Sequence, residues 1–151
     1  NARRSGNYDP ALRQLNRINQ QYAGYAIHDK VIFFLGKSYL QSGQPAEAIR
    51  QFRRLANEYP NSTFRPAAYL NIAYAQQQRG DLDLALEALD RVQELQDHAL
   101  VPEALHQQAR IHQRKGDTTA AREILASMVD RFDTGSYWVE QARMARFQTA
   151  R

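Results

Sequence analysis

The sequence lacks cysteine, holds little glycine and proline, and has no long apolar run, and each absence excludes a class of protein. Without cysteine there is no disulfide framework, no thiolate metal site and no cysteine nucleophile. The longest strongly apolar run covers only residues 31–35, far short of the roughly 18 residues that a membrane-spanning helix needs. With 7 glycines, 5 prolines and no low-complexity tract, the 151 residues are expected to fold as one domain.

The charge of the chain is only modestly positive. Twenty basic residues stand against 16 acidic ones, which gives a net charge of +4. This excess favours acidic partners but is too weak to indicate nucleic acid. The sequence begins with Asn1 rather than Met, and so membrane anchoring through a signal peptide or lipid anchor upstream stays open.

One phrase of about ten residues occurs four times, starting at glycines that are 37, 37 and 36 residues apart. Each glycine is followed five residues later by alanine and nine residues later by leucine or phenylalanine. These positions are Gly6, Gly43, Gly80 and Gly116; Ala11, Ala48, Ala85 and Ala121; Leu15, Phe52, Leu89 and Leu125. The spacing predicts a helix with one apolar face after each glycine, and the small alanine indicates a close helix crossing.

A second apolar stripe precedes the last three glycines, so each unit is expected to be a helix, a glycine turn and a second helix. Helices are predicted at about 10–22, 29–42, 45–58, 65–79, 82–95, 102–115, 118–132 and 137–149, in an all-α chain. Pro10 and Pro45 are expected in first helical turns, Pro66 and Pro102 at the openings of first helices, and Asp81 and Asp117 at N-caps.

These residues resemble the tetratricopeptide repeat, a helix pair of 34 residues. The unit at about 29–62 matches its pattern with Ile32, Leu35, Gly36, Tyr39, Ala48, Phe52 and Pro60. The units at 66–99 and 102–135 depart from it at Gln76, Gln108 and His112. Residues 6–23 resemble the second helix of an earlier unit, and 137–149 a closing first helix with Ala145 at its small position. The resemblance implies a right-handed α-solenoid over residues 1–151.

The repeats are longer than 34 residues because of extended links such as "EYPNSTFRPAAY" from Glu58 to Tyr69. This link is similar to those of bacterial envelope members of the family, which include the lipoprotein of the outer-membrane assembly machine and a Tol-Pal-associated periplasmic protein. The resemblance implies a periplasmic or envelope-associated protein with a role in outer membrane assembly. A cytoplasmic location is the alternative.

No catalytic, cofactor or metal site is predicted from the sequence. His106 and His112 are six residues apart and point to different sides of a helix, while His28 and His98 are expected at the surface near helix ends. No nucleophile elbow or glycine-rich phosphate loop is present. The sequence therefore predicts a protein without a cofactor that is not an enzyme.

The first helix of each pair is expected to line a concave groove for an extended peptide or partner helix of acidic character. The predicted groove residues are Lys30, Phe33, Lys37, Asn71, Tyr74, His106, Arg110 and Arg114. The favoured interpretation is a protein-interaction scaffold or adaptor. Two alternatives stay open: an RNA-binding helical repeat, and the interaction segment of a larger enzyme or secretion protein.

Overall fold

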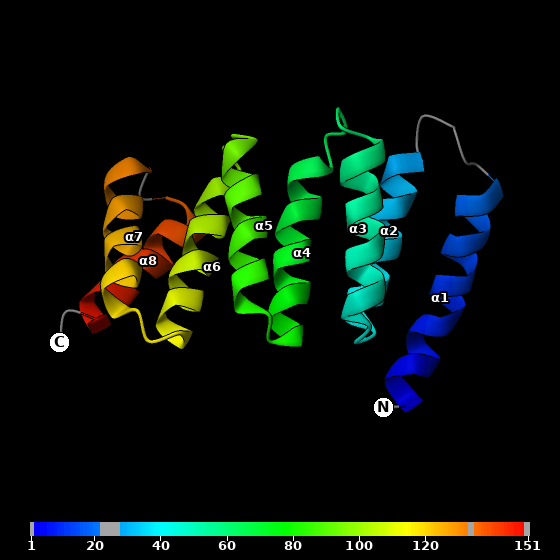
Figure 1. The fold of residues 1–151 in the computed structure, drawn as a ribbon, viewed down its shortest axis with the longest axis horizontal. Coiled ribbons are helices and arrows are strands. Elements are labelled where there is room, and N and C mark those ends of the chain that lie inside the picture. The colour runs from blue at the N-terminus through cyan, green and yellow to red at the C-terminus, as the bar shows by residue number, and fades with distance from the viewer. Residues whose placement is uncertain (1, 22–27, 133–134, 150–151) are drawn as a thin grey trace. The chain divides into compact units, whose positions relative to one another are not determined.

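The structure is a computed structural model that describes residues 2–21, 28–132 and 135–149, and in these ranges the chain forms helices and no strand (Figure 1). The elements are α1 (Ala2–Gln21), α2 (His28–Gln41), α3 (Pro45–Glu58), α4 (Arg65–Arg79), α5 (Leu82–Glu94), α6 (Val101–Arg114), α7 (Thr118–Arg131) and α8 (Tyr137–Thr149). The all-α prediction is confirmed, and α2 to α8 begin and end within one residue of the predicted bounds.

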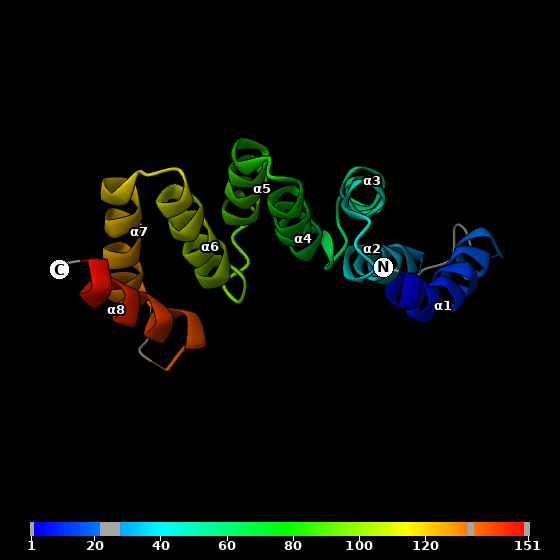
Figure 2. The same cartoon turned by 90° about the horizontal axis from the view of Figure 1, so that it is seen from below.

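The chain divides into two compact units, an N-terminal unit of residues 1–88 and a C-terminal unit of residues 89–151, with the boundary inside α5. In the N-terminal unit, α2 and α3 run antiparallel side by side and α4 packs against α3 (Figure 1). In the C-terminal unit, α7 packs against both α6 and α8 (Figure 2).

The predicted turn chemistry is present at the last three glycines. Gly43, Gly80 and Gly116 have φ values of 79°, 82° and 86°, which side chains other than glycine rarely adopt. The N–H of Gly80 bonds back to the carbonyls of Gln76 and Gln77 and so ends α4. Asp117 caps α7 by accepting a hydrogen bond from the N–H of Ala120 at 3.0 Å.

The predicted helix crossings form the core. Ala48, Ala85 and Ala121 are fully buried, as the repeated phrase indicates. In the pair α2–α3, a Cβ atom built on Gly36 would lie 2.7 Å from two ring carbons of Phe52, so the glycine lets the aromatic ring lie directly on the α2 backbone. In the C-terminal unit, one cluster joins α6, α7 and α8 through Val101, Leu105, Ala109, Ala121, Leu125, Met128 and Ala142.

The first copy of the phrase does not form a turn, and here the prediction is wrong. α1 is continuous from Ala2 to Gln21, with Gly6 and Pro10 inside it. Glycine inside a helix costs only about 1 kcal/mol relative to alanine, so a single glycine at position 6 does not by itself end α1. The apolar phase also shifts, because Ala11 is exposed and Leu12 is buried instead.

The link after α3 is hydrogen-bonded to the beginning of α2. The Tyr59 hydroxyl pairs with Nδ1 of His28, and the Ser62 hydroxyl donates to the carboxylate of Asp29. His28 is only 2% exposed, so its predicted surface position is wrong. The Tyr-Pro-Asn-Ser segment of the link thus joins the start of one helix pair to its end.

Candidate functional site

The predicted groove residues of the N-terminal unit lie on α2 and α4, but not all of them reach the surface. Lys30 is exposed, and Lys37 and Tyr74 are half-buried. Phe33 and Asn71 are buried in the unit, and the side-chain amide of Asn71 donates to the carbonyl of Ala67 at 2.8 Å. Lys30, Lys37 and Tyr74 are therefore the members of this predicted set with surface available to a partner.

Phe33 belongs to an aromatic cluster rather than to an open wall. Its ring centroid lies 5.8 Å from that of Phe52 on α3 and 5.0 Å from that of Phe64, which precedes α4. Phe34 joins this cluster at 5.5 Å from Phe33 and is still 44% exposed. The sequence analysis missed Phe34, although its place four residues after Lys30 and three before Lys37 puts it near both lysines on α2.

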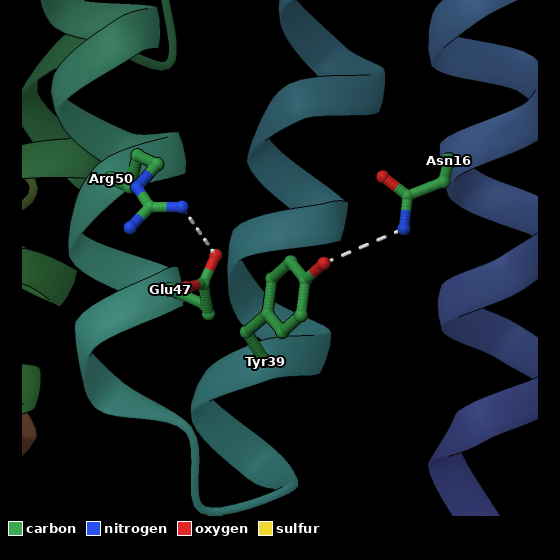
Figure 3. Close-up of polar contacts among 4 residues, drawn as sticks. All are labelled: Asn16, Tyr39, Glu47 and Arg50. Atoms are coloured by element: carbon green, nitrogen blue, oxygen red, sulfur yellow. Dashed lines mark hydrogen bonds and ion pairs between the residues drawn. The ribbon is translucent and has the colours of Figure 1, made fainter.

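Contacts with α1 and α3 hold α2 in place. Asn16 on α1 donates its side-chain amide to the Tyr39 hydroxyl at 3.4 Å (Figure 3). The same amide group also donates to the carbonyl of Leu12 at 3.0 Å. Tyr39 is the aromatic residue of the repeat pattern in the first complete unit. Because α2 packs against both α1 and α3, its exposed side chains are carried by a fixed backbone.

In the C-terminal unit, α6 carries the remaining predicted residues. Arg110 and Arg114 are exposed. His106 is half-buried, because the ring of Trp138 on α8 lies over it with a centroid distance of 5.2 Å. Burial of the imidazole, and secondly the positive charge of Arg110, lower the pKa of His106 below its ordinary value.

The departures from the repeat pattern also have a structural role. Gln108 stands at the leucine position of its repeat and is buried, and its side-chain amide donates to the carboxylate of Asp90 on α5 at 2.8 Å. An apolar contact is thereby replaced by a hydrogen bond to a charged group.

Phe33 and His106 share one position of the repeat, and both contact an aromatic residue at the beginning of the next first helix.

Neither a metal site nor a membrane-spanning helix is found in the part of the chain that the structure describes. No three histidine, aspartate or glutamate side chains come together there in a way that could hold a metal ion. Among the same residues, every helix is too short or too polar to cross a bilayer.

Two family models match the chain. Residues 25–99 match an outer membrane lipoprotein family, YfiO, and residues 103–134 match a tetratricopeptide repeat. No curated protein matches the chain by sequence.

Solved structures with tetratricopeptide-like repeats share the fold. Nearly identical repeats from a Podospora anserina kinesin light chain match 99% of this chain and 86% of theirs, at 20% identity and a TM-score of 0.71. MamA matches 98% of this chain and 80% of its own, at 18% identity and a TM-score of 0.68. A tetratricopeptide repeat protein from Parabacteroides merdae has a TM-score of 0.75 at 12% identity, and this chain covers 55% of it.

Proposed function

Because residues 103–134 match a tetratricopeptide repeat and the chain shares the fold of solved tetratricopeptide-like repeats, we propose that it is a non-catalytic scaffold that binds a peptide or a partner segment through its first helices. The observation that carries this proposal is a shared position six residues before each turn glycine. Lys37, Tyr74 and Arg110 stand there on α2, α4 and α6, and each is half-buried or exposed rather than packed into the core. Within the N-terminal unit, a cation and an aromatic side chain in one register suit an acidic segment with an apolar anchor, and Arg110 holds the same position in the repeat of the C-terminal unit.

The proposed setting is the bacterial cell envelope, in the assembly of the outer membrane. Support comes from the match of residues 25–99 to an outer membrane lipoprotein family. Those residues include the Tyr59–Ser62 segment that is bonded to the start of α2. The envelope-type link of the sequence is thus a structural part of the matched region.

Binding through these positions is tested by changing all three. Tyr74→Ala should mainly speed dissociation and cost about 2 kcal/mol of binding free energy, as a central aromatic anchor does. Lys37→Glu and Arg110→Glu should slow association and reduce its salt dependence, because the steering charge is reversed. The measurement is capture of partners from envelope extracts of the source organism, followed by kinetics with each captured protein.

A matched control keeps the number of reversed charges but moves them off the first helices. Arg13→Glu on α1 and Arg53→Glu on α3 change two exposed arginines. This variant should bind partners as wild type does, and thermal melts should show that both variants fold. Equal capture by the wild type and the triple variant would exclude the first-helix surface.

A further inference from the structure

Three basic side chains follow one another along α6 at a spacing of one turn. His106, Arg110 and Arg114 are four residues apart, so they lie on one side of the helix. Arg110 and Arg114 are exposed, and like charges at this spacing destabilise a helix. No acidic residue stands three or four positions from Arg110 in the sequence to offset its charge.

Other surface arginines of the chain are neutralised within their own helix. On α3, Arg50 pairs with Glu47 and Arg54 pairs with Glu58, each at 3.0 Å. None of the ion pairs found among the described residues involves an arginine of α6. The charge on this side of α6 is therefore complementary to a carboxylate that a partner brings.

The imidazole of His106 is a second observation that points to a ligand. Its Nδ1 atom is buried and has no hydrogen-bond partner among the described residues, so the other ring nitrogen, Nε2, is the one that a ligand can use. The ring centroid of Trp138 on α8 lies 5.2 Å from that of the imidazole, within the roughly 6 Å at which an aromatic ring attracts a cation. A protonated imidazole is thus compatible with this contact once the charge of Arg110 is offset.

We propose that Arg110, His106 and Trp138 form a subsite for the carboxylate of a glutamate or aspartate side chain of the partner segment. The carboxylate accepts hydrogen bonds from the guanidinium of Arg110 and from Nε2 of His106, which takes up a proton from the solvent. The ring of Trp138 covers the methylene groups of the same side chain. The subsite rests on the proposed function, because Arg110 is one of its three positions, and it specifies which group of the partner is bound.

Proton uptake by His106 makes binding at this subsite sensitive to pH. In the free protein, burial and then the charge of Arg110 lower the pKa of His106. Among the described residues, no charged side chain of α5, α7 or α8 contributes to this effect, and the contact from α8 is the uncharged Trp138. A carboxylate beside the ring opposes Arg110 and raises the pKa, so the affinity should increase as the pH falls from 8 to 6.

NMR titration of the histidines with a defined peptide tests the subsite. The probe is a short peptide of glutamates around one leucine, blocked at both ends, and the control peptide has glutamine in place of glutamate. At saturation, the glutamate peptide should raise the pKa of His106 by about one pH unit, as a nearby opposite charge does. The pKa of His98, which is exposed in the same unit, should not change, and the glutamine peptide should change neither.

Two variants connect this response to the proposed contacts. Arg110→Gln should weaken binding of the glutamate peptide about tenfold, because a hydrogen bond between charged groups is lost. Arg53→Gln, at an exposed arginine of α3, is the matched control and should bind as the wild type does. In His106→Gln the affinity should stay constant between pH 8 and pH 6, where the glutamates of the peptide remain ionised.

Four results would overturn the subsite: no binding of the glutamate peptide, equal binding of the glutamine peptide, an unchanged pKa of His106 at saturation, or wild-type affinity in Arg110→Gln. These results are distinguishable from failure of the proposed function. Loss of envelope partners by Tyr74→Ala, with a wild-type result for Arg110→Gln, would exclude the subsite and retain the proposed function. The expected response of His106 to the peptide, with equal capture by the wild type and the triple variant, would retain the subsite and exclude the proposed function.

Discussion

Single residues decide how closely the helices of this protein approach, and Gly36 is the clearest case. A methyl group at this position would lie 2.7 Å from ring carbons of Phe52, whose side chain is fully buried. Gly36→Ala should therefore overpack the α2–α3 crossing and cost about 1–3 kcal/mol, despite the better helix propensity of alanine.

Urea unfolding measures this cost. Gly135→Ala is the matched control, because a Cβ atom at Gly135 meets nothing within 4 Å. The control should unfold at the midpoint of the wild type. An unchanged midpoint for Gly36→Ala would mean that α2 and α3 separate more easily than their packing indicates.

His106 makes the C-terminal unit sensitive to acid. Its folded-state pKa is lowered, first by burial and then by Arg110, so the folded protein disfavours the charged imidazole. The stabilisation contributed by the neutral form is fully present above the ordinary pKa of about 6.5 and is lost as the pH falls below it. The urea midpoint reported by Trp138, the only tryptophan, should therefore fall between pH 8 and pH 5.

Two variants identify the group responsible for this acid sensitivity. In His106→Gln the urea midpoint should depend less on pH, because the titrating group that contacts Trp138 is removed. His98→Gln is the control, since His98 is exposed, and it should keep the dependence of the wild type. A wild-type profile in His106→Gln would assign the effect to another residue.

At the scale of elements, the link between α3 and α4 stabilises the start of α2 through hydrogen bonds to His28 and Asp29. Tyr59→Phe keeps the ring but removes the hydroxyl that pairs with His28, which is almost completely buried. Losing one partner of a buried polar group costs about 1–3 kcal/mol. Thermal or urea unfolding should show this loss, while Tyr137→Phe, at a mostly exposed tyrosine, should change little. Equal stability of the two variants would show that the hydrogen bond between Tyr59 and His28 does not stabilise the fold.

The elements that follow the local repeat pattern could be predicted, and those that depend on distant contacts could not. Alanine and glycine at fixed spacing predict the crossings at Ala48 and Gly36, because the constraint lies within one helix pair. The burial of His28 depends on Tyr59, 31 residues away, and no periodic pattern contains that information. Gly6 repeats the phrase, but a single glycine does not by itself end a helix, and α1 continues through it.

The residues of the candidate surface could also be predicted only in part from the sequence. Register alone placed Lys37 and Tyr74 on positions that stay outside the core. It could not show that Phe33 is covered by Phe64, nor that His106 is covered by Trp138, since both contacts come from the beginning of another first helix. The same lack of tertiary information hid Phe34, which the aromatic cluster leaves partly exposed.

For the whole molecule, the distribution of charge argues against nucleic acid more strongly than the net charge does. The densest basic group is Arg50, Arg53 and Arg54 on α3, but Arg50 pairs with Glu47 and Arg54 with Glu58, each at 3.0 Å (Figure 3 shows the first pair). Acidic side chains on the same helix thus offset two of the three cations. Any binding of single-stranded RNA should be weak, independent of sequence and largely abolished by salt.

Removing those acids should strengthen the weak binding to phosphate that we expect of the wild type. In Glu47→Gln with Glu58→Gln, Arg50 and Arg54 lose their ion pairs and become available to phosphate. Two additional phosphate contacts should steepen the slope of log K against log salt by about 1.4 for a single strand, because each contributes about 0.7. Titration of a labelled oligonucleotide at several salt concentrations measures both slopes. Tight, sequence-selective binding by the wild type at physiological salt would instead make RNA the partner of this repeat protein and reverse the preference for a protein ligand.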